Sequence, residues 1–133
     1  MAALYTTSLS ASAIRYLLVI QSFSNNQESS QTAMQSRGRG VRSSAIADGM
    51  GVSRPSVHKM MESLSKAGLI HKDGYGAVFF TEEGENLAGL YEVCFERLAD
   101  RLRGILPEDT DFIQAICMLL SVMTPEGLKE LGS

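Results

Sequence analysis

The spacing of apolar residues predicts that most of this chain is helical, with a short interruption by strands near its middle. Two helical patterns lie on either side of Gly51, and the apolar positions of the second follow the spacing i, i+3, i+4 and i+7. That spacing places them in one stripe on the side of a helix that packs against the rest of a domain. The stripe consists of Val57, Met60, Met61 and Leu64.

Residues that favour helix ends and turns stand at the ends of these two patterns. Ser43 or Ser44 is expected to cap the first helix, and Gly51 lies where the turn needs a left-handed backbone, which glycine adopts without steric cost. Ser53 is expected to cap the second helix by accepting a bond from an unpaired backbone N–H. Pro55 suits the first turn, because its missing N–H is not needed there.

A β-hairpin is expected directly after the second helix. Gly68 ends that helix, and the segments Leu69–Lys72 and Ala77–Phe80 lie on either side of an Asp-Gly-Tyr-Gly turn at 73–76. An Asp-Gly pair in this position is a strong hairpin signal. Two helices joined by a sharp turn and followed by a hairpin make a winged helix-turn-helix, which places its second helix in a DNA groove. A small helical core unit with a solvated face is the alternative interpretation.

The segments before this module differ in polarity. A buried first helix is expected to run from a serine cap near Ser10 to about Phe23, because it is apolar nearly all round. Residues 24–40 are polar, rich in Ser, Gln and Asn, and contain Arg37 and Arg39. That composition predicts a flexible insertion, since the segment cannot bury enough apolar surface to offset its ordering entropy. A basic arm that contacts DNA phosphates is the alternative.

Three further helices are expected after the hairpin. A long amphipathic helix covers about 81–105 and ends before Pro107, a strongly apolar helix follows Asp109 or Asp111, and Thr124 caps a short last helix. The strongly apolar helix has few polar positions and therefore needs apolar cover on two sides. A homodimer provides the second side, and twofold dimers are the commonest oligomers.

These patterns predict a mainly α protein with two regions. Residues 1–80 form a winged helix-turn-helix DNA-binding region that contains the flexible insertion, and residues 81–133 form a helical dimerisation region. The first region carries eight Lys or Arg and four acidic residues, a net charge of +4, whereas the second carries four basic and eleven acidic residues, a net charge of −7. A basic part joined to an acidic part favours a DNA-reading region beside an assembly region.

Other features exclude several classes of protein. No apolar run reaches the roughly eighteen residues of a membrane helix, and the N-terminus lacks the basic start and cleavage site of a secretion signal. Cys94 and Cys117 form no spaced framework, so we expect reduced thiols in a cytoplasmic protein. No catalytic residue is predicted, because the sequence has no Gly-rich phosphate loop, nucleophile elbow or usefully spaced His–carboxylate pair.

Several short motifs follow one another in an order that is more specific than any one of them alone. They are Val41-Arg42-Ser43 before Ile46-Ala47, Gly51 to Val57, Ala67 to Ile70, Phe80 to Gly84, Leu87-Ala88 and Val122 to Glu126. In this order the chain resembles the DtxR/MntR family of metal-dependent transcriptional repressors, from about Ser12 to Leu131 apart from the insertion.

The resemblance implies a homodimer that represses transcription by binding palindromic operators in double-stranded DNA. It implies that the start of the second helix reads bases, with Pro55 contacting thymine methyl groups, and that Lys72 contacts phosphate. Arg42 belongs to a basic cluster beside the module. The predicted DNA-binding residues are Arg42, Ser53, Arg54, Pro55, Ser56, Lys59 and Lys72.

In the family that the chain resembles, an activating Mn²⁺ or Fe²⁺ ion is bound by side chains, and this sequence has other residues at most of those positions. That site needs carboxylates on the first helix, a histidine on the long helix and a Glu/Cys…Glu-His cluster on the next helix, since these metals prefer oxygen and imidazole ligands. No acidic residue precedes Glu28, and the histidine position falls on Phe95. In the cluster, Cys117 remains while Leu120 and Ser121 take the Glu and His positions. We therefore expect no metal ligands, no cofactor, and a repressor whose DNA-competent form does not require Mn²⁺ or Fe²⁺.

Two other classes of function stay open. A MarR-like regulator would bind a small organic ligand in a pocket among the apolar helices, and a winged helix can also serve protein–protein contact alone. Arg54, Lys59 and Lys72 on the presented face favour DNA over a protein partner.

Overall fold

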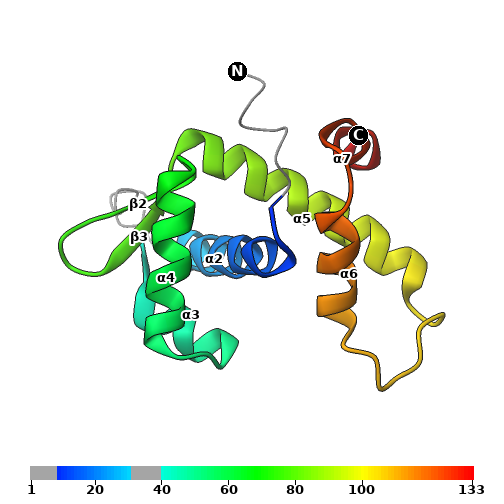
Figure 1. Cartoon of the computed structure of the whole chain (residues 1–133), viewed down its shortest axis with the longest axis horizontal. Coiled ribbons are helices and arrows are strands. Elements are labelled where there is room, and N and C mark those ends of the chain that lie inside the picture. Colours follow the sequence, from blue (N-terminus) through cyan, green and yellow to red (C-terminus); the bar gives the residue numbers. More distant parts are fainter. Residues whose placement is uncertain (1–8, 31–39) are drawn as a thin grey trace. The chain divides into compact units, whose positions relative to one another are not determined.

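A computed structural model describes residues 9–30 and 40–133 of the chain (Figure 1). Its elements, in order, are α2 (Ala11–Ser30), β1 (Val41–Arg42), α3 (Ser43–Met50), α4 (Arg54–Lys66), β2 (Ile70–Lys72), β3 (Ala77–Phe80), α5 (Glu82–Leu102), α6 (Phe112–Ser121) and α7 (Pro125–Gly132). The predicted mainly α fold with a winged helix-turn-helix is confirmed. Within the described ranges, no helix is both long and apolar enough to span a membrane.

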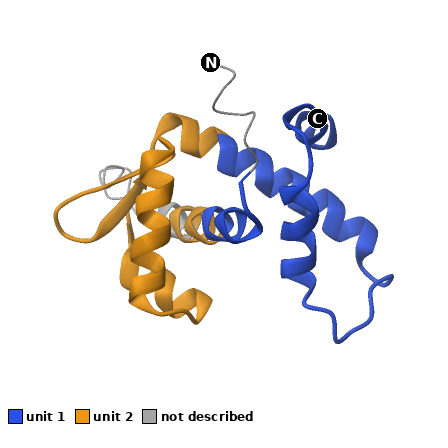
Figure 2. Ribbon diagram, in the orientation of Figure 1, with its two compact units in different colours: residues 1–18, 87–133 blue, residues 19–86 orange. Residues whose placement is uncertain are grey.

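The chain forms two compact units, which Figure 2 colours separately. One consists of residues 19–86, and the other combines Leu87–Ser133 with the beginning of the chain up to Leu18. Helices α2 and α5 are each shared between the two units. The beginning of the apolar first helix therefore belongs to the same compact unit as the C-terminal helices. The division into a DNA-binding region at 1–80 and a dimerisation region at 81–133 concerns function and stays a prediction.

The unit of residues 19–86 contains the winged helix-turn-helix. Its strands form an antiparallel sheet in the order β1-β3-β2, with Val41 opposite Val78 and Ile70 opposite Phe80. Helix α3 packs against α4 and β1, and α4 packs against β2. Strand β1 is a feature that the sequence pattern did not predict, because two residues are too short to show an alternation.

The turn between α3 and α4 follows the prediction, but the cap of α3 does not. Gly51 has a φ of +69°, and its N–H donates to the carbonyl of Ala47 as the helix closes. The residue at the cap of α3 is Arg42, which makes no side-chain capping bond, so the predicted serine cap is wrong. The hydroxyl of Ser43 instead donates to the carbonyl of Gly76 in the wing at 3.3 Å.

Helix α2 ends at Ser30 rather than near Phe23, so the first part of the predicted flexible insertion is helical. Each residue added to an existing helix gains one backbone hydrogen bond, and polar residues continue a helix on which they are exposed to water. The polar composition after Phe23 therefore does not by itself indicate the end of the helix. The rest of the predicted insertion, residues 31–39, lies outside the described residues.

The other unit places helix caps where its sequence favours them. Asp111 caps α6 by accepting from the N–H of Gln114 at 3.2 Å, and Thr124 caps α7 by accepting from the N–H of Gly127 at 3.0 Å. The thiol of Cys94 on α5 donates to the carbonyl of Leu128 on α7. The fully buried side chains of this unit include Ile14, Leu17, Ile116, Cys117 and Leu120.

Candidate nucleic-acid interface

Helix α4 begins with a hydrogen-bonded serine cap. The backbone of Ser53 is extended, with φ −76° and ψ 157°, and its hydroxyl accepts a bond from the N–H of Ser56 at 3.2 Å. The same hydroxyl donates to the hydroxyl of Ser56 at 3.0 Å. Pro55 lies in the first turn, as predicted. The cap orders the beginning of the helix, where Ser53, Arg54, Pro55 and Ser56 are all exposed.

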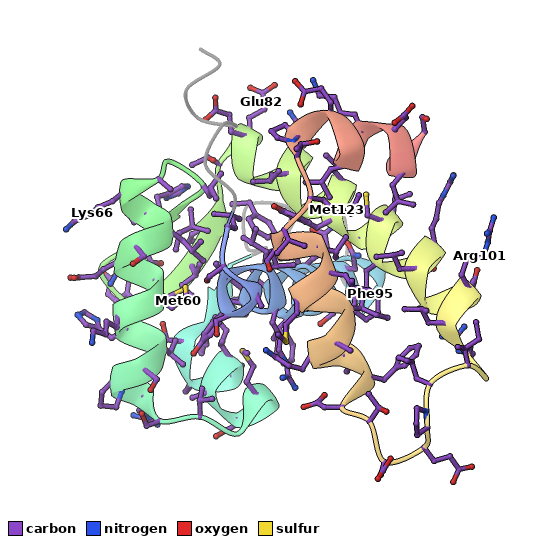
Figure 3. The ribbon with its side chains drawn as sticks, turned by 45° about the vertical axis from the view of Figure 1, so that its right-hand side comes forward. Met60, Lys66, Glu82, Phe95, Arg101 and Met123 are labelled. Carbon is purple, nitrogen blue, oxygen red and sulfur yellow. The ribbon has the colours of Figure 1, made fainter. Side chains whose placement is uncertain are left out.

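The two sides of α4 differ in burial, as the apolar stripe predicts. Val57, Met61 and Leu64 are at most 2% exposed, whereas Met60 is only half-buried. The predicted DNA-binding residue Lys59 is exposed on the other side of the helix. Lys66 is exposed at the far end and projects away from α4 (Figure 3). The buried stripe attaches α4 to its unit and leaves the polar side available for a partner.

Not all of the exposed charge on α4 is positive. Nε2 of His58 lies 3.4 Å from a carboxylate oxygen of Glu62, one helical turn further along, and both side chains are more than half exposed. An exposed pair of this kind contributes little to stability. Glu62 reduces the positive charge of the middle of the helix, so the exposed positive charge of α4 lies towards its two ends, with Arg54 and Lys59 near the beginning and Lys66 in the last turn.

The wing is organised by the carboxylate of Asp73. One of its oxygens accepts from the N–H of Tyr75 at 2.8 Å and from the N–H of Ala77 at 3.0 Å. These two bonds, that from Ala77 first, lower the pKa of Asp73 below its ordinary value, because they stabilise the charged form. Lys72 is exposed beside this turn, and the side chain of Tyr75 at its tip is 86% exposed.

The structure brings some of the predicted DNA-binding residues together and leaves others apart. Arg42 and Arg54 line one hollow with a volume of about 230 Å³, together with the wing residue Tyr75. Ser53, Pro55, Ser56, Lys59 and Lys72 are not among its lining residues. Sequence reasoning missed Tyr75, although an aromatic residue inside an Asp-Gly-Tyr-Gly turn has no core to fill and is itself a signal for a binding contact.

The residues at the family's ligand positions do not fit a Mn²⁺ or Fe²⁺ ion. Cys117 and Leu120 are fully buried, and the hydroxyl of Ser121 donates to the carbonyl of Met118 on its own helix. Phe95 is half-buried on α5 (Figure 3). Within residues 9–30 and 40–133, no three His, Cys, Asp or Glu side chains lie close enough together to hold a metal ion. The donor set required by these metals is therefore not assembled in this part of the chain.

Two charged groups act on the thiol of Cys117, the guanidinium of Arg15 and the carboxylate of Asp111. Burial raises the pKa of the Cys117 thiol, and the guanidinium of Arg15 opposes that rise only in part. Arg15 lies on α2, and its Nη1 donates to Oε1 of Gln114 on α6 at 3.3 Å. The guanidinium of Arg15 disfavours the approach of a divalent metal ion, and the carboxylate of Asp111, which also acts on this thiol, opposes that effect.

Comparison with solved structures identifies proteins of the same fold. The hypothetical protein SSo2273 from Sulfolobus solfataricus aligns with a TM-score of 0.59 and 20% sequence identity, over 92% of this chain and 86% of its own. The manganese regulator SloR aligns with a TM-score of 0.60 and 20% identity, over 90% of this chain. IdeR from T. acidophilum aligns with a TM-score of 0.54 and 18% identity, over 89% of this chain. The alignments cover 51% of SloR and 51% of IdeR, so this chain spans about half the length of each.

Comparison by sequence leads to a family. No curated protein matches the chain. Residues 9–78 match the family described as "Iron dependent repressor, N-terminal DNA binding domain". The match covers slightly more than half of the 133 residues and includes α3, α4 and the wing turn. The chain therefore belongs to the iron-dependent repressors, a family of DNA-binding transcription regulators.

Proposed function

We propose that this protein is a dimeric transcriptional repressor that binds double-stranded operator DNA through α4 and the wing, and that it does so without Mn²⁺ or Fe²⁺. The observation that carries the proposal is the exposed beginning of α4, where Ser53, Arg54, Pro55 and Ser56 stand out from a helix whose other side is buried. A helix held in this way is suited to enter the major groove with its first residues against the base edges.

The residue types at this surface suit the two kinds of DNA contact. Arg54 offers a planar guanidinium for a guanine, and Pro55 offers an apolar contact for a thymine methyl group. Lys59 and Lys72 are exposed amines that suit phosphate oxygens. The proposed base-reading residues are thus at the beginning of α4, and the proposed phosphate contacts lie further along α4 and in the wing.

Dimerisation is proposed from the outer side of α6. Ile116, Cys117 and Leu120 are fully buried on one side of this helix, whereas Met118 is 55% exposed and Val122, at its end, is 77% exposed. Leu119 is also 44% exposed on the outer side. An isolated subunit would leave this apolar side in water, and a second copy of α6 would cover it.

Independence from metal is proposed because side chains already join the two helices that carry most of the family's ligand positions. The hydrogen bond between Arg15 and Gln114 links α2 to α6, and Ile116 and Leu120 on α6 are fully buried. A resident guanidinium thus provides a positive charge where the family implies a bound cation. The DNA-competent arrangement would then be present at all metal concentrations.

Fluorescence anisotropy on labelled fragments from the surrounding genome tests the proposal. The full chain is titrated into each duplex with EDTA, and again with added Mn²⁺ or Fe²⁺. We expect saturable, salt-sensitive binding that is the same with chelator and with metal. Binding that appears only with added metal would contradict the metal-independent part, and no binding to any fragment under either condition would favour a winged helix used for protein contact.

A lysine substitution on α4 tests the proposed interface itself. Lys59→Ala is expected to weaken binding and to reduce the slope of log K against log salt by about 1, because one phosphate contact and its released counterion are lost. Lys66→Ala, at the far end of the same helix, is the matched control and should keep the wild-type slope. Equal slopes for Lys59→Ala and the wild type would exclude Lys59 from the interface.

A further inference from the structure

A hollow of about 230 Å³ lies between the beginning of α3, the beginning of α4 and the turn of the wing. Its lining residues come from all three of these elements, and most of them are small or basic. They are Arg42, Ser43, Ser44, Arg54, Val57, Tyr75 and Gly76. All of them belong to the compact unit of residues 19–86, so the hollow is formed by one unit.

Hydrogen bonds hold the three elements around this hollow. The N–H and the hydroxyl of Ser43 both donate to the carbonyl of Gly76, at 3.1 and 3.3 Å, and so attach the beginning of α3 to the wing. Arg42 pairs with Ala77 in the sheet. The carboxylate of Asp73 accepts from the N–H groups of Tyr75 and Ala77 and orders the turn. The hollow is therefore built by ordered backbone and does not depend on a free loop.

The polar side chains of the lining carry hydrogen-bond donors and positive charge. Arg42 and Arg54 carry guanidinium groups, and Ser44 and Tyr75 carry hydroxyls. No acidic side chain is among the lining residues. The carboxylate of Asp73 is near enough to Arg42 for the guanidinium to contribute to lowering its pKa, but its contacts are with the backbone of the wing turn.

The beginning of α3 adds to the same positive potential. Its capping residue, Arg42, makes no side-chain bond to the first N–H groups of the helix. The positive end of a helix dipole attracts anions, and the beginning of α3 lines the hollow together with Arg42 and Arg54, although the N–H of Ser43 itself donates to Gly76. Arginine in particular matches the paired oxygens of a phosphate with parallel N–H donors.

We propose that this hollow is a phosphate pocket, in which Arg42 and Tyr75 hold one phosphodiester group of duplex DNA beside the base-reading Arg54. The inference rests on the proposed function, and it adds a phosphate site that borders the base-reading surface of α4 at Arg54. DNA is the source of the phosphate because Arg54 belongs both to the pocket and to the beginning of α4, so a strand that passes the helix also passes the pocket. The contact would fix the position of the helix on the duplex without reading its sequence.

Anisotropy with a labelled duplex of random sequence tests this contact, since a phosphate contact does not require the operator. Arg42→Gln and Tyr75→Phe are compared with the wild type over a series of salt concentrations. We expect Arg42→Gln to weaken binding about eightfold at 0.1 M salt and to reduce the salt slope by about 0.9. Tyr75→Phe, which removes only a hydroxyl, is expected to weaken binding about fivefold and to keep the slope.

Arg101→Gln provides the matched control, because Arg101 is an exposed arginine of α5 outside the pocket, which projects into solvent (Figure 3). It should bind with the wild-type affinity and slope. Circular dichroism of each variant confirms that the fold is retained. If Arg42→Gln and Tyr75→Phe bind as tightly as the wild type and with its slope, the phosphate pocket is excluded while DNA binding stands. If the wild-type protein binds neither this duplex nor any genomic fragment, the proposed function fails.

Inorganic phosphate distinguishes the two sources of a phosphoryl group. It is titrated into the full chain at constant ionic strength, without DNA, and the heat of binding is recorded. We expect no saturable heat at low millimolar phosphate, because one small anion makes only a few exposed contacts. Saturable binding that Arg42→Gln and Tyr75→Phe abolish, together with unchanged binding of the duplex, would assign the pocket to a free phosphate and overturn the proposal.

Discussion

Arg15 and Gln114 are separated by 99 residues in the sequence, yet Nη1 of Arg15 donates a hydrogen bond to Oε1 of Gln114 at 3.3 Å. The bond joins α2 to α6 inside one compact unit, next to the buried thiol of Cys117. A charged donor that crosses between two helices at a partly buried position specifies how those helices face each other. It also places a permanent positive charge beside the ligand-type position that the sequence retains.

The contribution of this bond to stability can be measured by a double-mutant cycle. Arg15→Met and Gln114→Leu each keep most of the apolar volume and remove one partner. We expect a coupling free energy of about 1 kcal/mol between the two sites, as for a hydrogen bond that is partly exposed to water. The free energy of unfolding in urea provides the measurement for the wild type, both single variants and the double variant. A coupling indistinguishable from zero would show that the bond is not formed in solution.

Two glycines of α5 make a second, independent prediction. A Cβ on Gly84 would fall onto the carbonyl oxygen of Leu69, well inside van der Waals contact, whereas a Cβ on Gly89 meets nothing. We therefore expect Gly84→Ala to destabilise the fold by about 3 kcal/mol or more, because backbone atoms have to move. Gly89→Ala is expected to stabilise it by about 0.5–1 kcal/mol, since alanine is the better helix former. Thermal unfolding followed by circular dichroism compares the two variants, and equal melting temperatures would contradict this packing.

The sequence was sufficient to predict the winged module, because its signals are local. Gly51, Ser53 and Pro55 each act through the backbone within one turn, and the stripe of α4 repeats with the helical period. The end of α2 at Ser30 could not be read in the same way, since a polar composition after Phe23 does not distinguish a loop from a helix that continues.

Features that depend on distant residues were beyond the sequence pattern. The pairing of β1 with β3 involves only two residues, and the serine predicted as the cap of α3 bonds the wing instead. The candidate site is divided in the same way. Its exposed residues on α4 could be predicted from the helical period. The hollow lined by Arg42, Arg54 and Tyr75 could not, because it forms only when the sheet brings the wing close to the beginnings of α3 and α4. The bond between Arg15 and Gln114 had no signal in either local segment.

Asp73 should make the wing sensitive to acid. Its pKa is lowered by the N–H groups of Ala77 and Tyr75, so the folded wing favours the carboxylate. The stabilisation is fully present at pH above the pKa of the unfolded carboxyl, and it is lost as the pH falls through the lower pKa of the folded state. An NMR titration of the amides of Tyr75 and Ala77 is expected to give a midpoint below the ordinary value of 3.8.

Substitutions separate this effect from general acid unfolding. Asp73→Ala removes the acceptor and should abolish the transition of both amides, while Asp109→Ala, in the exposed turn before α6, should leave it unchanged. A midpoint for Asp73 at or above 3.8 in the wild type would show that the two backbone bonds do not persist in solution.

The two sides of α6 should respond in opposite ways to a change in polarity. Met118→Glu places a charge on the outer side, where the side chain is 55% exposed, and should leave the free energy of unfolding of a subunit nearly unchanged. In a dimer that covers this side, the same charge would be buried without a partner, so dissociation of the dimer is expected. Sedimentation equilibrium measures the mass of the wild type and of the variant at the same concentration.

Leu120→Ala is the contrasting substitution on the inner side of α6. Leu120 is fully buried, so its truncation is expected to cost about 2–5 kcal/mol of folding stability through lost burial and a residual cavity. The loss should appear in urea unfolding of this variant, with no direct effect on the contact between subunits.

If the wild type sediments as a monomer at all concentrations, the outer side of α6 is not a dimer interface. The repressor would then have to bind its operator as single subunits, without the twofold symmetry that half-sites one helical turn apart require.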